Sequence, residues 1–119
     1  MDESHDLRSL TIAPGVIETI IMLAILEVEG IAAVGSKPTA QGVFSSLGKK
    51  QVTPGIMIYE DDDQVIVDAH VQVFYGYRLT DIAESVRVAV VNALESQANI
   101  DVAAVNVTID AIQFSGQQL

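Results

Sequence analysis

The sequence predicts an α+β fold, a two-layer sandwich in which two helices cover one face of a mixed sheet. Segments 65–75 and 102–114 alternate apolar and polar residues with period two, as half-buried strands do. Segments 14–29 and 79–98 repeat apolar residues with helical periodicity. A sheet with one apolar and one polar face is covered by helices on one side only. The expected order of elements is β-α-β-β-β-α-β.

The elements follow one another between two polar ends. Residues 10–13 predict a short strand, and Pro14–Glu29 predicts a helix with Pro14 at its first position and Gly30 as a left-handed cap after its end. The remaining elements are a strand at 31–35, a long loop at 36–54, strands at 55–60 and 65–75, a helix from Arg78 or Leu79 to Ala98, and a strand at 102–114. We expect one domain over 10–114, with flexible tails at 1–9 and 115–119.

The composition excludes several classes of protein. The chain has 119 residues, a net charge of −10 and no cysteine, which rules out a disulfide framework and thiolate chemistry. Its acidity argues against nucleic-acid binding, because neutralising phosphates requires clustered Lys and Arg. The mean hydropathy is nevertheless +0.38, which is high for a small acidic protein. The sequence therefore joins two properties, acidity and an excess of apolar residues, that need a common explanation.

The apolar excess does not predict a membrane span. The most apolar run, 19–26, is bracketed by Glu18 and Glu27 and is far shorter than the roughly 20 residues that a bilayer helix needs. The first nine residues are acidic and polar, unlike the basic start of a signal peptide. We expect a cytoplasmic protein with no direct membrane insertion, whose membrane contact is peripheral or through a partner.

The two predicted helices differ on their outer sides. The core face of the second comprises Leu79, Ile82, Ala83, Val86, Val90 and Leu94, and its far side is mostly polar. The core face of the first comprises Ile17, Ile20, Ile21, Ala24 and Val28. Its far side is less polar and carries Met22, Leu23 and Leu26. These three residues predict either packing beside the second helix or a contact with another molecule.

The polar face of the sheet offers a weak candidate for chemistry. Asp68, His70 and Asp110 meet there if the fourth and fifth strands are neighbours, and a histidine between carboxylates can bind a metal or transfer protons. An open sheet face excludes no water, however, and polar residues are expected on it anyway. We therefore favour a solvated face, and the sequence indicates no catalytic residue, no metal site and no cofactor.

The loop at 36–54 is the one basic part of the chain. It contains Lys37, Lys49 and Lys50, half of the six basic residues, and no acidic residue. It also carries Phe44 and Leu47 in a Gly- and Ser-rich setting. Two interpretations stay open: the loop folds Phe44 back onto the core, or Phe44, Leu47, Lys49 and Lys50 dock on a partner or an anionic surface.

The sequence resembles the bacterial alkaline-shock, or envelope stress response, protein family over about residues 10–114. The features that carry the resemblance are Glu29-Gly30-Ile31 with Val34 after it, Tyr75-Gly76 before the second helix, and the late Val105-Asn106-Val107. The resemblance implies cytoplasmic location, self-association and a role in cell-envelope homeostasis. It also implies, for some members, tethering by an integral membrane partner, and for others an association with fatty-acid synthesis genes. It carries over no catalytic residue.

These observations predict a non-enzymatic, self-associating scaffold or adaptor at the cytoplasmic side of the envelope. We expect a homo-oligomer, in which Met22, Leu23 and Leu26 are buried against another copy or a membrane-anchored partner. The alternative is a regulatory binding module for an acyl-lipid biosynthesis enzyme, which uses the 36–54 loop. A hydrolase or metal enzyme centred on Asp68 and His70 is the third class.

Overall fold

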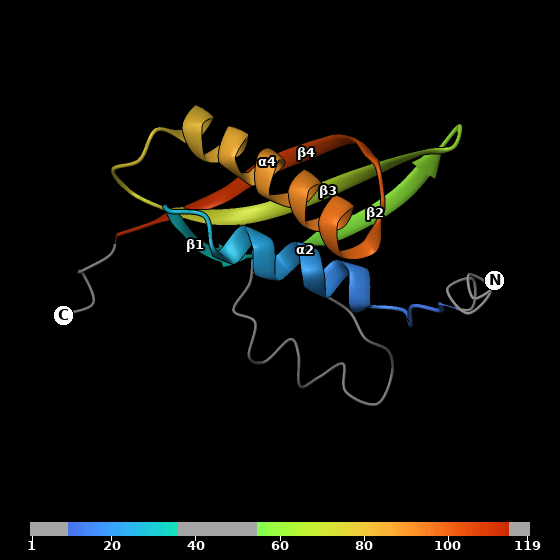
Figure 1. Cartoon of the computed structure of the whole chain (residues 1–119). Helices are drawn as coiled ribbons and strands as arrows, with labels where there is room; N and C mark the ends of the chain where they lie inside the picture. Colours follow the sequence, from blue (N-terminus) through green and yellow to red (C-terminus); the bar gives the residue numbers. More distant parts are fainter. Residues whose placement is uncertain (1–9, 36–54, 115–119) are drawn as a thin grey trace.

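A computed structural model describes residues 10–35 and 55–114 and has the predicted α+β architecture (Figure 1). The elements run in the order α-β-β-β-α-β, and the two helices pack against the sheet. Their bounds are α2 Val16–Leu26, β1 Ile31–Val34, β2 Ile56–Asp61, β3 Gln64–Phe74, α4 Leu79–Ala98 and β4 Val102–Gln113.

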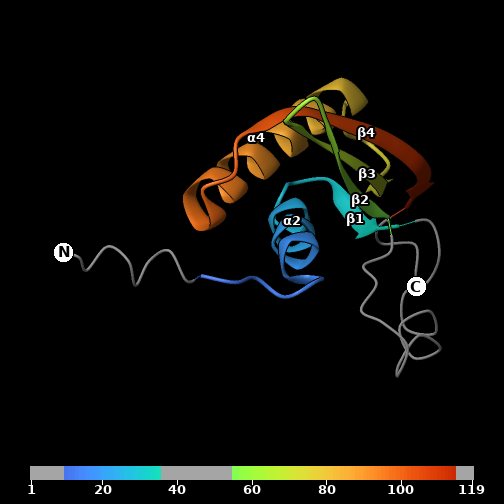
Figure 2. The same cartoon turned by 90° about the vertical axis from the view of Figure 1, so that its right-hand side faces the viewer.

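Strand β3 is the centre of the sheet. β1 and β2 both pair with it antiparallel and lie end to end along one of its edges, opposite residues 71–73 and 64–69 respectively. β4 pairs with the other edge of β3 in parallel. The sheet is therefore mixed, as predicted, and the crossover from β3 to β4 is made by α4. Figure 2 shows α2 and α4 together on one side of the sheet, and no described helix covers the other side, which we call the open face.

Segment 36–54 leaves and rejoins the sheet at neighbouring positions, Gly35 and Gly55, on the β3 edge that pairs with β1 and β2. The Gly35 N–H donates to the carbonyl of His70 over 2.7 Å, and the His70 N–H donates to the carbonyl of Gly55 over 2.8 Å. A Cβ added to Gly55 would lie 2.7 Å from the Gly35 Cα. Both glycines have positive φ, 95° and 85°, and this close approach needs residues without a side chain. β1 and β2 are thus two halves of one antiparallel strand, interrupted opposite His70.

The core lies between the sheet and the two helices. Alternate residues of β3 point into it, and Val67, Ala69, Val71 and Val73 are completely buried. α2 and α4 pack against this face with a second set of buried side chains, which comprises Ile21, Ile25, Ile82, Val86, Val90, Ala93 and Leu94. Burial of aliphatic side chains at about 25 cal/mol per Å² is the main favourable term that holds the two layers together.

The structure corrects the predicted start of the fold. Residues 10–13 form no strand, and Leu10 is 74% exposed. β1, β2 and β4 are the partners of β3, and residues 10–13 pair with no strand of the sheet. The first helix is also shorter than predicted. It begins at Val16, after Gly15 in a left-handed conformation, and ends at Leu26, although Gly30 is left-handed as expected.

The structure also corrects details of the predicted core faces. Ile25 is fully buried in α2, although it was not expected on the core face. In α4, Leu79 is 42% exposed, and Ala93 is buried in addition to the expected residues. In β4, the alternation predicted over 102–114 is interrupted by register shifts between Val102 and Ala104 and between Ile109 and Ala111, and the second shift pairs Ala111 with Gln72 of the polar face. A β-bulge of this kind reverses the alternation after it, which the residue pattern alone does not reveal.

Candidate functional site

An apolar stripe runs along the outer side of α2. Val16, Leu23 and Leu26 are 42%, 53% and 44% exposed, and Thr19 between them is exposed as well. The Thr19 hydroxyl donates to the Gly15 carbonyl over 2.8 Å, so its donor is satisfied within the helix. The spacing of three, four and three residues places all four side chains on one line, the spacing of a coiled-coil seam. We call these four residues the α2 stripe.

The α2 stripe borders a groove between the two helices. The groove has a volume of about 540 Å³, and most of the residues that line it are apolar. The lining residues are Ile20, Leu23, Ala24, Glu27 and Val28 of α2 and the following turn, with Ala89, Ala93 and Gln97 of α4. Leu23 belongs to both the stripe and the groove. The two features form one continuous apolar surface on the side of the molecule opposite the open sheet face.

Of the two alternatives for the first helix, the structure shows packing beside the second helix, whereas contact with another molecule stays a prediction. One flank of α2 lies beside α4, where Ile20 and Ala24 line the groove. Leu23 and Leu26 remain exposed. Met22 is half-buried and packs against the core, so it is not part of the exposed line. Val16 takes its place, and the three-four-three spacing from Val16 to Leu26 is the signal that identifies it.

The residues of the second predicted contact are not within the described part of the chain. Phe44, Leu47, Lys49 and Lys50 all belong to 36–54, and their docking role stays a prediction. The structure does describe where this segment is attached. It leaves and rejoins the sheet at Gly35 and Gly55, beside His70, at the edge formed by β1 and β2.

The open sheet face is polar and holds its own hydrogen bonds. The Tyr59 hydroxyl of β2 donates to the carboxylate of Asp68 on β3, and the Asn106 amide of β4 donates to the same carboxylate over 2.8 Å. The Tyr59 bond, followed by the Asn106 bond, holds the pKa of Asp68 below its ordinary value. The Asp68 carboxylate in turn raises the pKa of Tyr59. This network links three strands across the sheet.

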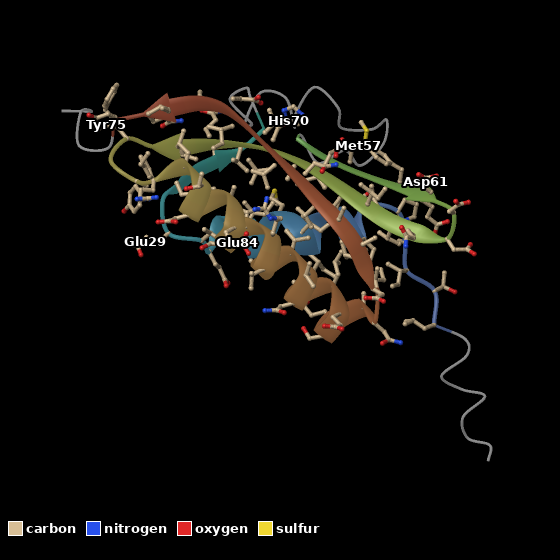
Figure 3. The ribbon with its side chains drawn as sticks, turned by 90° about the horizontal axis from the view of Figure 1, so that it is seen from above. Glu29, Met57, Asp61, His70, Tyr75 and Glu84 are labelled. Carbon is tan, nitrogen blue, oxygen red and sulfur yellow. The ribbon has the colours of Figure 1, made fainter. Side chains whose placement is uncertain are left out.

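A second pair and a buried amide continue this face. The His70 Nδ1 lies 3.0 Å from a carboxylate oxygen of Asp110, and the His70 side chain is 47% exposed (Figure 3). Further along β3, the buried Gln72 donates to the Gly35 carbonyl over 2.8 Å and accepts from Gln113 over 2.7 Å. Asp68 and Asp110 thus bond to different partners and do not enclose His70 between them.

The described residues give no support for a metal enzyme on this face. Within 10–35 and 55–114, no group of three or more His, Cys, Asp or Glu residues is arranged to hold a metal ion. Hydrogen bonds to Tyr59, Asn106 and His70 already occupy the carboxylates of Asp68 and Asp110.

The part of the chain that the structure describes contains no helix with the length and hydropathy to cross a bilayer.

Comparison with known proteins finds relatives along nearly the whole chain. The profile of the alkaline shock protein 23 family, described by a cell envelope-related function, matches residues 2–114. The uncharacterized protein YqhY of Bacillus subtilis is 30% identical over 112 residues, which cover 94% of this chain and 82% of YqhY. The uncharacterized protein Spy1614 of Streptococcus pyogenes is 25% identical and covers 91% of this chain and 90% of its own. No solved structure matches the chain significantly.

Proposed function

This chain belongs to the alkaline shock protein 23 family, whose function is cell envelope-related, and we propose that it acts as a non-enzymatic, self-associating scaffold or adaptor. It works at the cytoplasmic side of the envelope and reaches the membrane through a partner. The observation that carries the proposal is the α2 stripe, which is exposed and uncharged in an otherwise acidic protein. Large apolar residues in a continuous exposed patch are typical of protein contacts.

The stripe suits a second copy of the same helix. Its four residues contain no charge, and the only charged residue within α2, Glu18, lies off the line. When two such helices cross about a twofold axis, each stripe meets an identical stripe, which is the self-complementarity that a symmetric dimer requires. Leu23 and Leu26 of one copy then fill the space beside those of the other, and the groove between α2 and α4 receives the flanking side chains.

The net charge of −10 per copy sets the conditions of association. Two like-charged bodies repel each other, and salt screens this repulsion beyond a Debye length of about 8 Å at physiological ionic strength. Burial of Leu and Val side chains depends little on salt at these concentrations. Self-association through the stripe is therefore expected to strengthen as salt is raised, the opposite of an interface built on ion pairs.

The proposal is tested by sedimentation velocity on the wild type, Leu23→Glu and Leu26→Glu over a range of concentrations. Each glutamate places a charge in the contact, so both variants are expected to shift to smaller species. Met57→Glu is the matched control, because Met57 is 58% exposed on the open sheet face and the charge change is the same.

Two outcomes count against the proposal. If the wild type stays monomeric at high concentration, the protein does not self-associate. If Leu23→Glu associates as strongly as the wild type, the contact lies on another surface. Urea unfolding of each variant shows whether a smaller species is still folded.

The adaptor role has its own test. Capture of a membrane-anchored protein by the wild type and by Met57→Glu, but not by Leu23→Glu, would identify an adaptor that uses the same stripe.

A further inference from the structure

The outer edge of β4 is a second uncovered region of the molecule. Within the described residues, β4 pairs with β3 along one side, and no strand pairs with its other side. Eight of its twelve residues are exposed. Figure 2 shows β4 as an outer strand of the sheet. A strand in this position presents a row of backbone N–H and C=O groups that are free to bind another strand.

The opposite edge of the sheet has features that discourage such pairing. The line of β1 and β2 is interrupted where segment 36–54 leaves and returns, at Gly35 and Gly55. Its far end carries Glu60 and Asp61, followed by the acidic turn 62–63. Short edge strands, interruptions and clustered charges are the usual protections of a sheet edge.

The β4 edge has fewer of these protections. Its register with β3 shifts at Ala103 and at Asp110, but residues 104–109 between the two shifts are regular and uncharged. The strand is twelve residues long, about 40 Å at 3.3 Å per residue, and its only charged residue is Asp110. The Asp110 carboxylate is bound to His70 over the open face. Ala103, Ala104 and Ala111 are exposed and small, so they allow another backbone to approach. A long, nearly uncharged edge is a template for strand addition.

We infer that β4 is a second self-association surface, at which β4 of one copy pairs antiparallel with β4 of a second copy. The inference deepens the proposed self-association by adding a contact distinct from the α2 stripe. A twofold axis perpendicular to the sheet joins two edges of equal length and keeps both helix layers on the same side. The apolar faces and the polar faces of the two sheets then each become continuous, which a partner strand of unrelated pattern would not achieve.

Two different twofold contacts on one chain have a consequence for assembly size. The α2 stripe lies on the helix layer, and β4 lies at the border of the sheet. A copy that uses both contacts has two neighbours, so assembly continues beyond a dimer. Loss of either contact leaves a dimer, and loss of both leaves a monomer.

The experiment uses a matched pair of proline variants in β4. Residues 104–109 are in regular register with β3, and there the N–H groups of successive residues point to opposite edges. One of Val107→Pro and Thr108→Pro therefore removes an outward N–H and the other an inward one, each compared with the alanine variant at the same position. The variant with the outward change is expected to keep its denaturation midpoint, because β3 loses no bond. The other is expected to unfold at a lower urea concentration, which identifies it as the inward change.

Sedimentation velocity then compares these variants with and without Leu23→Glu. We expect Leu23→Glu alone to be a dimer and Leu23→Glu with the outward proline to be a monomer. A Leu23→Glu variant that is monomeric where the wild type associates would overturn the inference and leave the α2 stripe as the association surface. If Leu23→Glu associates as the wild type does, the proposed function fails at the stripe. The outward proline alone then decides the β4 contact: loss of association supports it, and unchanged association overturns it.

Amide hydrogen exchange in the Leu23→Glu background is a second, independent measurement. In the monomer, protection along residues 104–109 of β4 is expected to alternate, because in this regular stretch only every second N–H is bound to β3. At high concentration the alternate, outward amides gain protection. Alternation that is identical at low and high concentration would overturn the inference.

Discussion

The outer surface of the helix layer and the open face of the sheet expose side chains of opposite character. On the sheet, the carboxylates of Asp68 and Asp110 bind Tyr59, Asn106 and His70 within the same chain. On the helix layer, Leu23 and Leu26 are exposed with nothing among the described residues to cover them. The carboxylates of the sheet face are thus bonded within one copy of the protein, whereas the two leucines are exposed to solvent.

This difference is the physical basis of the proposed contact at α2. Polar groups in mutual hydrogen bonds need no other molecule to lower their free energy. Exposed leucines, by contrast, gain about 25 cal/mol for each Å² of apolar surface that another molecule removes from water. Burial of apolar surface therefore favours α2 over the face around His70 as the place where another molecule binds.

The largest expected change in the free energy of unfolding distinguishes the inner side of α2 from its outer side. Ile25→Ala removes a fully buried side chain and is expected to lower the free energy of unfolding by about 3 kcal/mol. Leu23→Ala removes a half-exposed one and is expected to cost less than about 1 kcal/mol. Urea unfolding of the two variants provides the measurement. Equal losses would mean that Leu23 belongs to the core.

A smaller effect is expected at the buried amide of the open face. Gln72→Ala removes the donor of the Gly35 carbonyl and the acceptor of Gln113, and its expected cost is about 1 to 2 kcal/mol. The self-association of this variant should equal that of the wild type, because the change lies on the sheet. A large shift in sedimentation with unchanged stability would show that the open face, too, is a contact surface.

The acid dependence of stability is expected to report on Asp68. Its folded-state pKa is lowered, chiefly by the Tyr59 hydrogen bond, so its contribution is fully present above the ordinary aspartate pKa and is lost as pH falls through the lowered value. The asparagine side chain of Asp68→Asn does not titrate. The urea midpoint of this variant should therefore decrease less than that of the wild type as pH is lowered over that range. Curves for wild type and variant that stay parallel there would show that the hydrogen bonds do not favour the charged form.

The smallest effect is expected at the exposed His70–Asp110 pair. His70→Ala should change the free energy of unfolding by less than about 1 kcal/mol, because exposed ion pairs contribute little. Added zinc should shift the melting temperature of the wild type no more than that of the variant. A zinc-dependent rise confined to the wild type would restore the metal-site hypothesis for this face.

Most of the fold was predictable because period-two and helical patterns record which side of an element is buried. The alternation from Val65 to Tyr75 identified β3, and the pattern of Ile82, Val86 and Val90 identified the buried side of α4. The strand at 10–13 was wrong, because a local apolar pattern does not show whether a segment finds a partner strand. Collinearity of β1 and β2 was equally hidden, since it depends on the approach of Gly35 to Gly55.

The candidate site was predictable in part. Leu23 and Leu26 were identified from the shortage of polar residues on one side of the helix, and both are exposed. Met22 was included because the predicted rotation of the helix omitted Ile25 from the core face, and the observed burial of Ile25 turns Met22 toward a flank. Val16 was missed, although it precedes Leu23 by seven residues, about two helical turns, and therefore lies on the same line of the helix. The role of Phe44 and Lys49 stays a prediction.

Crosslinking at the α2 stripe tests the proposed contact most directly. The chain has no cysteine, so Leu23→Cys and Met57→Cys each introduce a unique thiol, at positions of similar exposure on opposite faces. With a short thiol-specific crosslinker, Leu23→Cys is expected to give a covalent dimer whose yield rises with concentration and salt, and Met57→Cys is expected to give little. Equal yields from the two variants, or no dimer from Leu23→Cys where the wild type associates, would contradict self-association through α2.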